Sequence, residues 1–481
     1  MRIGIDIDNV ISNFDEVLKN AFLEHDKLLR NTGIVDDNLY ITSGMFDWSK
    51  EEINNFYYSN VERIAKSLSL IDDSKEYIDK LKSDGHFIYI ITGRDNGEYS
   101  NPFEMTKEWL NKNNIYYDEL IFTNSKDKNS KARACLENKI DIMIDDSVSI
   151  CKACLDNGII SLLMDKPCNR SSNIKRVYNW KDIYNFIINY KDTRLNVILD
   201  TDTYNECDDQ FALAYLLKSQ DRFRINAITI AQFSHKYNNV TTKDSQDLSY
   251  KEVVNISKML NFITDNRVFR GSTDYISNGY DEENNAVKKI IEVALNNEKT
   301  YIMATGALTN VALAIKHNPR IIDKIEVIWL GGNSFLQEDN LEYNFRQDIE
   351  AVRTVFESKV KLTVIPCKNV ASNLVTSIYE LEHYLKDKNE LCNYLIKRFY
   401  NDGYHGLTER RVIWDISVVA YLINKSWFKV SEVSCPEIDD DTSYIETTDK
   451  HLITVVNYLD VNSIYNDLFR KLGGSYEVNK Q

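Results

Sequence analysis

The sequence predicts a protein of two α/β domains, and three observations support this fold class. Its 481 residues are too many for one ordinary hydrophobic core. Short runs rich in β-branched and aromatic residues alternate with longer amphipathic segments, which is typical of α/β folds. The polar stretch KDTRLN separates two such series, so we expect one domain at residues 1–190 and a second at residues 194–481.

The first domain contains four segments that read as strands. They are RIGIDI (2–7), FIYIIT (87–92), IDIMID (140–145) and IISLLM (159–164). The sequence between Phe14 and Leu70 is helical and charged with few strand signals, so we expect an inserted cap at about residues 15–70. The amphipathic segment WKDIYNFIINY closes this domain.

The second domain repeats the alternation with a different set of segments. Its predicted strands are VILDTD (197–202), NAITIA (226–231), TYIMATG (300–306), KIEVIWLGG (324–332) and KLTVIP (361–366). A helix is expected to open at DDQFALAYLL (208–217), and the apolar spacing of RVIWDISVVAYLI (411–423) predicts another. The motifs that follow the acidic strand ends differ between the two domains, so an internal duplication is rejected.

Composition narrows the class of partner. A formal charge of −15 and a pI near 5.1 argue against non-specific binding to nucleic acid or to an anionic membrane, but allow small phosphorylated substrates. Asp6 and Asp8 interrupt any signal-peptide pattern, and no apolar run is long enough to span a bilayer. The eight scattered cysteines, including the lone CKAC motif, are expected to be reduced thiols in the cytoplasm.

Side chains suited to phosphoryl transfer follow three predicted strands of the first domain. Asp6 and Asp8 alternate with apolar residues, so both carboxylates face one side of an extended chain. The later strand ends and the segment between them add Thr92, Lys131, Asp145 and Asp146. A carboxylate can attack phosphorus, a second can protonate the leaving oxygen, and a hydroxyl and an ammonium can bind phosphoryl oxygens beside Mg²⁺.

Each of these motifs has a simpler interpretation when it is taken alone. A D-x-D pair is more often a solvated turn than a catalytic pair, and an I-D-D sequence can simply cap a helix. The hypothesis of a phosphatase site depends on finding all of them in this order at strand ends.

The set resembles the haloacid-dehalogenase-like phosphatases, and DIDNVISNFDE is similar to their 5′-nucleotidase branch over about residues 1–190. The resemblance implies a doubly wound, Rossmann-like domain with a helical cap. It makes Asp6 the nucleophile and Asp8 the general acid/base, and it assigns phosphate binding to Thr92 and Lys131, with Lys128 as a competing candidate. The magnesium site would comprise Asp6, Asp8, Asp145 and Asp146.

The second domain opens on DTDTYNECDDQFALAYLL at residues 200–217, where five of the first ten residues are acidic. So many carboxylates repel one another unless a cation lies among them, and an all-oxygen site suits Ca²⁺ or Mg²⁺. The helix N-terminus that follows offsets part of the charge. The alternative is an acidic loop with N-capping aspartates.

TYIMATGALTNVALAIKHNP, IWLGGN, EYNFRQDIEAVRTVF and VIWDISVVAYLI follow in that order. Together they resemble the nucleoside hydrolase family over about residues 194–481. The resemblance implies a second doubly wound, mostly parallel domain that holds Ca²⁺, with Mg²⁺ as the alternative. Its metal ligands would be Asp202, Asp209, Asp415 and the backbone carbonyl of Thr305; Asp202 would also be the general base, Asp200 would support the cluster, and ribose hydroxyls would bind Asp208, Glu342 and Asn344.

Two departures from the family pattern stand out. Five residues, Thr203 to Cys207, separate Asp202 from the D-D pair where the usual pattern has three. Trp414 occupies the position where many members carry a histidine that is associated with protonating the leaving base. Tryptophan has no catalytic proton but can stack on a base. Leaving-group activation is therefore unassigned, with His235, Tyr404 and His405 as weak loop candidates.

The leading hypothesis is a bifunctional hydrolase that dephosphorylates nucleoside 5′-monophosphates and then hydrolyses the nucleosides to base and ribose. The alternatives are a phosphatase of another small metabolite fused to a hydrolase of a different N-riboside, and a sensor that binds nucleotides or ribosides without turnover. The resemblance to nucleoside hydrolases also implies a homo-oligomer, either a dimer or a tetramer. The sequence indicates neither the preferred base nor the sugar.

Overall fold

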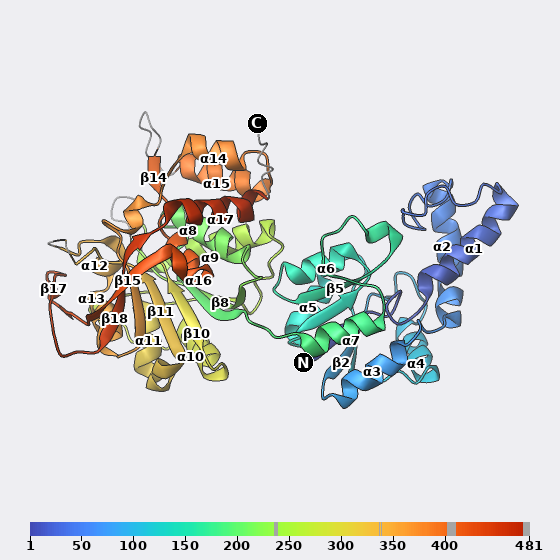
Figure 1. Ribbon diagram of the computed structural model, residues 1–481, viewed down its shortest axis with the longest axis horizontal. Helices are drawn as coiled ribbons and strands as arrows, with labels where there is room; N and C mark the ends of the chain where they lie inside the picture. The colour runs from blue at the N-terminus through green and yellow to red at the C-terminus, as the bar shows by residue number, and fades with distance from the viewer. Residues whose placement is uncertain (235–238, 336, 338, 402–409, 475–481) are drawn as a thin grey trace. The chain divides into compact units, whose positions relative to one another are not determined.

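The computed structural model divides into two compact units, Met1–Asp192 and Thr193–Gln481 (Figure 1). It describes residues 1–234, 239–335, 337, 339–401 and 410–474. Each unit has its own mainly parallel sheet with helices and its own hydrophobic core, which confirms the predicted fold class of two α/β domains.

The first unit is built on a six-stranded, all-parallel sheet with the order β3-β2-β1-β4-β5-β6. The strands are β1 (Arg2–Ile5), β2 (Phe87–Thr92), β3 (Glu119–Phe122), β4 (Ile142–Asp145), β5 (Ile160–Met164) and β6 (Arg176–Val177). The helices are α1 (Phe14–Leu29), α2 (Lys50–Ser67), α3 (Ser74–Ser83), α4 (Pro102–Lys112), α5 (Ser130–Glu137), α6 (Val148–Leu155) and α7 (Trp180–Asn189), with a 3₁₀ turn, η1 (Pro167–Asn169).

The strand order places β1 between β2 and β4, so the carboxyl ends of these three strands meet at one edge of the sheet. Asp6 follows β1, while Thr92 and Asp145 end β2 and β4. The helices α1 and α2 are inserted between β1 and β2, and Figure 1 shows them together at one end of this unit. Ligands of open parallel sheets bind at this kind of edge.

The helix α7 closes the first unit against the loop that follows β1. Its buried face carries Trp180, Ile183 and Ile187 at helical spacing. Trp180 is fully buried, and its indole Nε1 donates a hydrogen bond to the carbonyl of Val10 at 2.9 Å. The helix therefore holds the loop that begins with Asp6.

The second unit is built on an eight-stranded sheet with the order β15-β18-β12-β11-β10-β7-β8-β9, in which only β15 runs antiparallel to its neighbour. The strands are β7 (Leu195–Thr201), β8 (Phe223–Ile230), β9 (Val268–Arg270), β10 (Thr300–Ala304), β11 (Ile325–Leu330), β12 (Lys361–Ile365), β15 (Phe428–Ser434) and β18 (Leu452–Leu459). Two small antiparallel pairs accompany it, formed by β13 (Val375–Ser377) with β14 (Arg410–Val412) and by β16 (Glu437–Ile438) with β17 (Tyr444–Ile445).

The helices of the second unit cover both faces of this sheet. They are α8 (Asp208–Leu217), α9 (Thr242–Met259), α10 (Asn285–Asn296), α11 (Thr309–His317), α12 (Tyr343–Gln347), α13 (Ile349–Glu357), α14 (Ile378–Leu385), α15 (Glu390–Asn401), α16 (Ile416–Ile423) and α17 (Val461–Gly473). Short 3₁₀ segments are η2 (Ile276–Asn278), η3 (Pro319–Lys324), η4 (Ala371–Asn373) and η5 (Lys425–Trp427). Separate apolar clusters lie on the two sides of the sheet.

The helix α8 is buried around its whole circumference. All ten of its residues are buried, because eight largely apolar positions follow the two acidic residues of its first turn. It packs against α16, α9 and α17. A helix that is apolar all round belongs in a core, so its first turn is held in the interior together with Asp208 and Asp209.

The structure corrects one predicted element. The segment at residues 411–423 was expected to be a single helix, but Arg410–Val412 form β14 and the helix α16 begins only at Ile416. The strand forms because these residues pair antiparallel with Val375–Ser377 of β13, a partner distant in the sequence. Tertiary pairing has overridden the local apolar spacing here.

No disulfide joins the eight cysteines, all of which lie in the part of the chain that the structure describes. Among the helices of the described residues, none has both the length and the apolar character that crossing a membrane requires.

We expect Trp180→Ala to destabilise the first unit by about 3–5 kcal/mol, because it leaves a cavity and removes the bond to Val10. The measurement is the urea midpoint of the full chain followed by circular dichroism. Tyr178→Ala is the control, since Tyr178 is 68% exposed. Equal midpoints for the two variants would contradict this role of α7.

Candidate active sites

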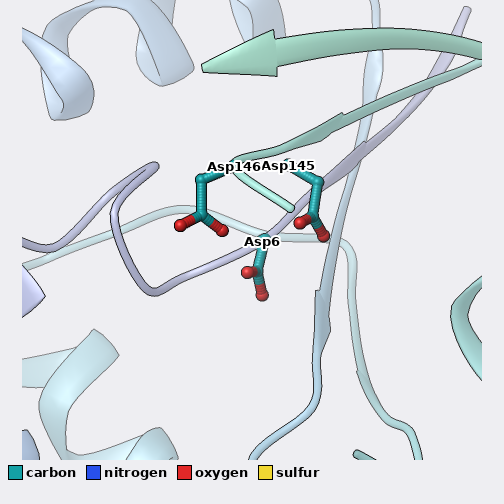
Figure 2. A group of neighbouring side chains, drawn as sticks. All are labelled: Asp6, Asp145 and Asp146. Carbon is teal, nitrogen blue, oxygen red and sulfur yellow. The ribbon is translucent and has the colours of Figure 1, made fainter. Parts of the chain in front are cut away.

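Three carboxylates gather at the edge of the first sheet. Asp6, Asp145 and Asp146 each offer an oxygen that lies within 4.8 Å of the others. Figure 2 shows their side chains side by side at the ends of β1 and β4. Because β1 and β4 are neighbouring parallel strands, their carboxyl ends bring these residues together across about 140 positions of sequence.

Lys131 is the cation inside this group. Its Nζ lies 2.8 Å from Oδ1 of Asp6 and 2.7 Å from Oδ2 of Asp145, and its side chain is buried. It comes from the first turn of α5. The competing candidate, Lys128, is exposed in the turn before that helix. The structure thus brings Lys131, and not Lys128, into the cluster.

The charge balance of this group leaves room for a divalent cation. Burial raises the pKa of Asp6 to about 8 although Lys131 opposes the shift, and burial also raises the pKa of Asp145. Burial alone would lower the pKa of Lys131, but Asp145 and Asp6 raise it. The two ammonium groups on these three carboxylates, Lys131 and Lys166, do not neutralise them. Hard carboxylate oxygen atoms are the ligands that Mg²⁺ prefers, so the residues present fit this ion.

The side chain of Asp8 lies outside the three-carboxylate group. Its Oδ2 accepts a hydrogen bond from Nε of Arg94 at 3.0 Å, and its Oδ1 accepts one from Nη2 at 2.5 Å. Arg94 is only 2% exposed. Thr92 is also buried, and its hydroxyl accepts a hydrogen bond from the backbone N–H of Arg94 at 3.3 Å. The loop after β2 therefore positions both Thr92 and Asp8.

Four residues near this site had no assigned role in the sequence. They are Arg94, Asn9, Asp15 and Lys166. Asn9 donates to Oδ2 of Asp146 at 3.0 Å and to Oδ1 of Asp15 at 3.1 Å, and Lys166 donates to Oδ2 of Asp146 at 2.8 Å and pairs with Asp15. Arg94 lies two residues after Thr92 and Asn9 directly follows Asp8, so adjacency to assigned residues was their only signal.

The second unit holds a separate carboxylate group. Asp208 and Asp209 open α8 and Asp415 precedes α16, and one oxygen from each lies within 4.8 Å of the others. The packing of α8 against α16 brings them together. The carboxyl group of Asp202, just after β7, interacts directly with Asp209. The structure therefore brings Asp208, Asp209 and Asp415 into one group, and Asp202 lies beside it rather than within it.

This second group carries excess negative charge in a buried place. Burial, reinforced by the neighbouring aspartates, raises the pKa of Asp202 and of Asp415 well above the ordinary range. Burial raises the pKa of Asp209 to about 6, although the hydroxyls of Thr201 and Thr305 donate to its Oδ1 at 2.6 and 2.9 Å. A divalent cation with oxygen ligands would relieve this repulsion, so the donor set fits Ca²⁺ or Mg²⁺.

Asp200 lies beside this group and has different partners. Its Oδ1 accepts hydrogen bonds from the hydroxyl of Thr229 at 2.6 Å and from Nδ2 of Asn310 at 2.9 Å. Burial raises its pKa to about 6. Asp200 thus links β7 to β8 and to α11, which fixes the strand end that Asp202 follows.

Glu342 and Asn344 are buried at the start of α12 with protein partners of their own. The carboxylate of Glu342 accepts hydrogen bonds from the backbone N–H groups of Gly332, Asn344 and Phe345 at 2.9, 2.9 and 3.0 Å. Asn344 donates to the carbonyl of Thr305 at 2.9 Å. A carboxylate has further lone pairs, so Glu342 retains capacity to accept from a ligand hydroxyl.

Three aromatic side chains lie close to the residues of the second site. Trp414 is half-buried directly before Asp415 and packs against the apolar cluster. Tyr275 donates to Oε1 of Gln347 at 2.6 Å, and Tyr343 donates to the carbonyl of Ser234 at 2.8 Å. Burial, the largest cause, raises the pKa of both tyrosines, and the charge of Asp202 raises it further. The candidates His235, Tyr404 and His405 lie outside the described residues.

Comparison with known families assigns both units to classes of hydrolase. Residues 1–193 match the model of the "5′ nucleotidase, deoxy (Pyrimidine), cytosolic type C protein" family. Residues 197–465 match the model of the inosine-uridine preferring nucleoside hydrolase family. The chain therefore joins two domains that match the models of two different hydrolase families. It belongs to the inosine-uridine preferring nucleoside hydrolase family, and its first unit has the 5′-nucleotidase match that the sequence resemblance predicted.

Individual relatives match parts of the chain. It is 32% identical over 145 residues to a probable ribonucleoside hydrolase of Dictyostelium discoideum, covering 27% of this chain and 42% of the relative. It is 29% identical over 158 residues to an inosine-uridine preferring nucleoside hydrolase of Crithidia fasciculata, covering 30% and 49%. The chain thus spans about half the length of these curated relatives. A solved plant nucleoside hydrolase is 18% identical with a TM-score of 0.48, covering 58% of this chain and 99% of that one.

We expect Asp209→Asn to weaken the binding of Ca²⁺ to the full chain at least about tenfold, because it removes one anionic ligand from the group. Isothermal titration calorimetry at constant pH measures this change. Asp26→Asn is the matched control, since Asp26 is equally buried but lies in the first unit, away from the group. Unchanged affinity in Asp209→Asn would contradict a cation site here.

Proposed function

We propose that the chain is a bifunctional enzyme of nucleotide breakdown. Its first unit dephosphorylates nucleoside 5′-monophosphates with Mg²⁺, and its second hydrolyses the N-glycosidic bond of the resulting nucleosides with Ca²⁺. The observation that carries this proposal is the pair of separate buried carboxylate groups, each at the carboxyl edge of its own parallel sheet. Each group lies in a unit that matches the corresponding hydrolase family.

In the first unit Asp6 attacks the phosphorus atom and forms an aspartyl-phosphate, while Asp8 donates a proton to the leaving 5′-oxygen. Asp8 then accepts a proton from the water that hydrolyses the intermediate. Lys131 and Thr92 bind phosphoryl oxygens, and Arg94 fixes the orientation of the Asp8 carboxyl group. Asp6, Asp8, Asp145 and Asp146 would hold Mg²⁺, which would supply positive charge that screens these carboxylates from the phosphate.

In the second unit Asp202 removes a proton from the water that attacks the anomeric carbon. The departing base leaves an oxocarbenium-like ribosyl cation, and the surrounding carboxylates favour this positive charge. Asp208, Glu342 and Asn344 hold the ribose hydroxyls, and Trp414 stacks on the base. Asp202, Asp209, Asp415 and the backbone carbonyl of Thr305 would hold Ca²⁺, which would lower the pKa of the attacking water.

The product of the first reaction is the substrate class of the second, which makes the fusion chemically coherent. The names of its relatives, a probable ribonucleoside hydrolase and an inosine-uridine preferring nucleoside hydrolase, favour ribonucleosides as substrates of the second unit. The unpaired cysteines suit a reducing compartment, so we place the enzyme in the cytoplasm. The resemblance of the second unit to nucleoside hydrolases adds a homo-oligomer, either a dimer or a tetramer, to the proposal.

The two activities are expected to separate by mutation. Asp6→Asn should lower phosphate release from nucleoside monophosphates by about a thousandfold or more and leave base release from nucleosides intact, because it removes the carboxylate that attacks phosphorus. Asp202→Asn should lower base release and leave phosphate release intact, because it removes the base that activates water. A panel of nucleotides and nucleosides, scored for free phosphate and free base, measures both. The two-step function fails if the wild type releases neither product from any member.

The proposed stacking of Trp414 on the base predicts that KM for nucleosides depends on an aromatic ring at position 414. Trp414→Phe should keep most of the affinity for nucleosides, whereas Trp414→Ala should raise KM about tenfold, since base–aromatic stacking contributes about 1–3 kcal/mol. Steady-state kinetics with one purine and one pyrimidine nucleoside measure KM. An alanine variant with wild-type KM would exclude contact between this ring and the base.

A further inference from the structure

The segment from Thr203 to Cys207, which is longer than the usual pattern of this family, forms a turn at the edge of the second carboxylate group. It connects the end of β7 to the start of α8. The backbone N–H of Asn205 donates to the carbonyl of Asp202 at 2.8 Å, so the chain folds back on itself within four residues. The turn therefore places the side chain of Asn205 next to the carboxylate of Asp202.

The two oxygens of the Asp202 carboxylate have different surroundings. Oδ2 accepts a hydrogen bond from Nδ2 of Asn205 at 3.1 Å. Oδ1 is buried and has no hydrogen-bond partner among the described residues. A Cβ placed on Gly306 would lie 3.4 Å from Oδ1, so this oxygen faces the loop after β10 that carries Thr305. Asn205 therefore engages one oxygen and leaves the other on the side of the assigned metal ligands.

The turn is anchored to the surrounding helices on both sides. The backbone N–H of Tyr204 donates to the hydroxyl of Ser249, in α9, at 3.3 Å. The ring of Tyr204 lies 5.2 Å from the guanidinium carbon of Arg398, in α15. These contacts limit the movement of the segment, so the amide of Asn205 is held in a fixed place relative to Asp202.

We propose that Asn205 is a positioning residue for the N-glycosidic reaction: its amide holds Oδ2 of Asp202, so that Oδ1 stays directed to the cation and the attacking water. An amide suits this place because it donates a hydrogen bond without adding charge to the anionic group. The lengthened segment is then the means by which this donor reaches Asp202. The proposal rests on the proposed function for its kinetic consequence, but not for its effect on cation binding.

The simpler interpretation is that Asn205 only stabilises the turn. The backbone bond between Asn205 and Asp202 already closes the turn without the side chain. The two interpretations therefore predict different effects of replacing Asn205. If the side chain only stabilises the turn, its loss lowers thermal stability; if it positions Asp202, its loss lowers kcat and Ca²⁺ affinity while the fold is unchanged.

Three variants of the full chain test this proposal. Asn205→Asp keeps the shape of the side chain but cannot donate when ionised, and Asn205→Ala removes the amide. Ser249→Ala is the control, because it removes the hydrogen bond that anchors Tyr204 and leaves the contact with Asp202 in place. The readouts are Ca²⁺ affinity by calorimetry, kcat and KM for nucleoside hydrolysis, and the unfolding temperature without Ca²⁺.

Both Asn205 variants should lower kcat about tenfold or more with KM changed by less than about threefold, since a hydrogen bond to a charged group is lost. Asn205→Ala should also weaken Ca²⁺ binding at least about threefold, while Ser249→Ala keeps wild-type kcat and affinity. Wild-type kcat and Ca²⁺ affinity in Asn205→Ala would overturn the proposal, as would a loss in all three variants that follows the unfolding temperature. If the wild type releases no base, the proposed function fails, and the Ca²⁺ affinity of Asn205→Ala alone decides the role of Asn205.

Discussion

Both units bury several carboxylates close together, and the free-energy cost of doing so is the constraint on which their sites depend. Parallel strands end at one edge of a sheet, and in each unit that edge collects aspartates that are far apart in the sequence. Burial penalises the charged carboxylates, as the raised pKa values of Asp6, Asp202 and Asp415 show. The surrounding elements therefore have to supply cations, donors or metal ligands.

The two units satisfy this constraint with different groups. The first places lysine and arginine side chains among its carboxylates: Lys131 contacts Asp6 and Asp145, Lys166 contacts Asp146, and Arg94 contacts Asp8. The second uses neutral donors at its core, with threonine hydroxyls on Asp209 and an amide on Asp202. Fixed cations suit the binding of an anionic phosphoryl group, whereas neutral donors preserve the negative potential that favours a ribosyl cation.

Much of the fold and of each site could be predicted from the sequence. Strand ends such as VILDTD combine an apolar run with carboxylates, and the apolar run after Asp208 and Asp209 predicts α8. Spacing within a strand or a helix is a local property, so these elements are readable without tertiary information. The exception is β14, which forms by pairing with β13, a partner distant in the sequence; there the local pattern extends the predicted helix over residues that form a strand.

The sequence by itself determined that this is a two-unit α/β protein with an acidic strand end at the start of each unit. Only the tertiary structure decided which partners those acids have. Arg94 reaches Asp8 across 86 positions, Lys131 rather than Lys128 enters the first group, and Asp208 joins Asp209 and Asp415 because α8 packs on α16. Even the contact between Asn205 and Asp202, three residues apart, depends on how a turn directs its side chains. Side-chain direction beyond a regular strand or helix follows from packing, and spacing alone does not encode it.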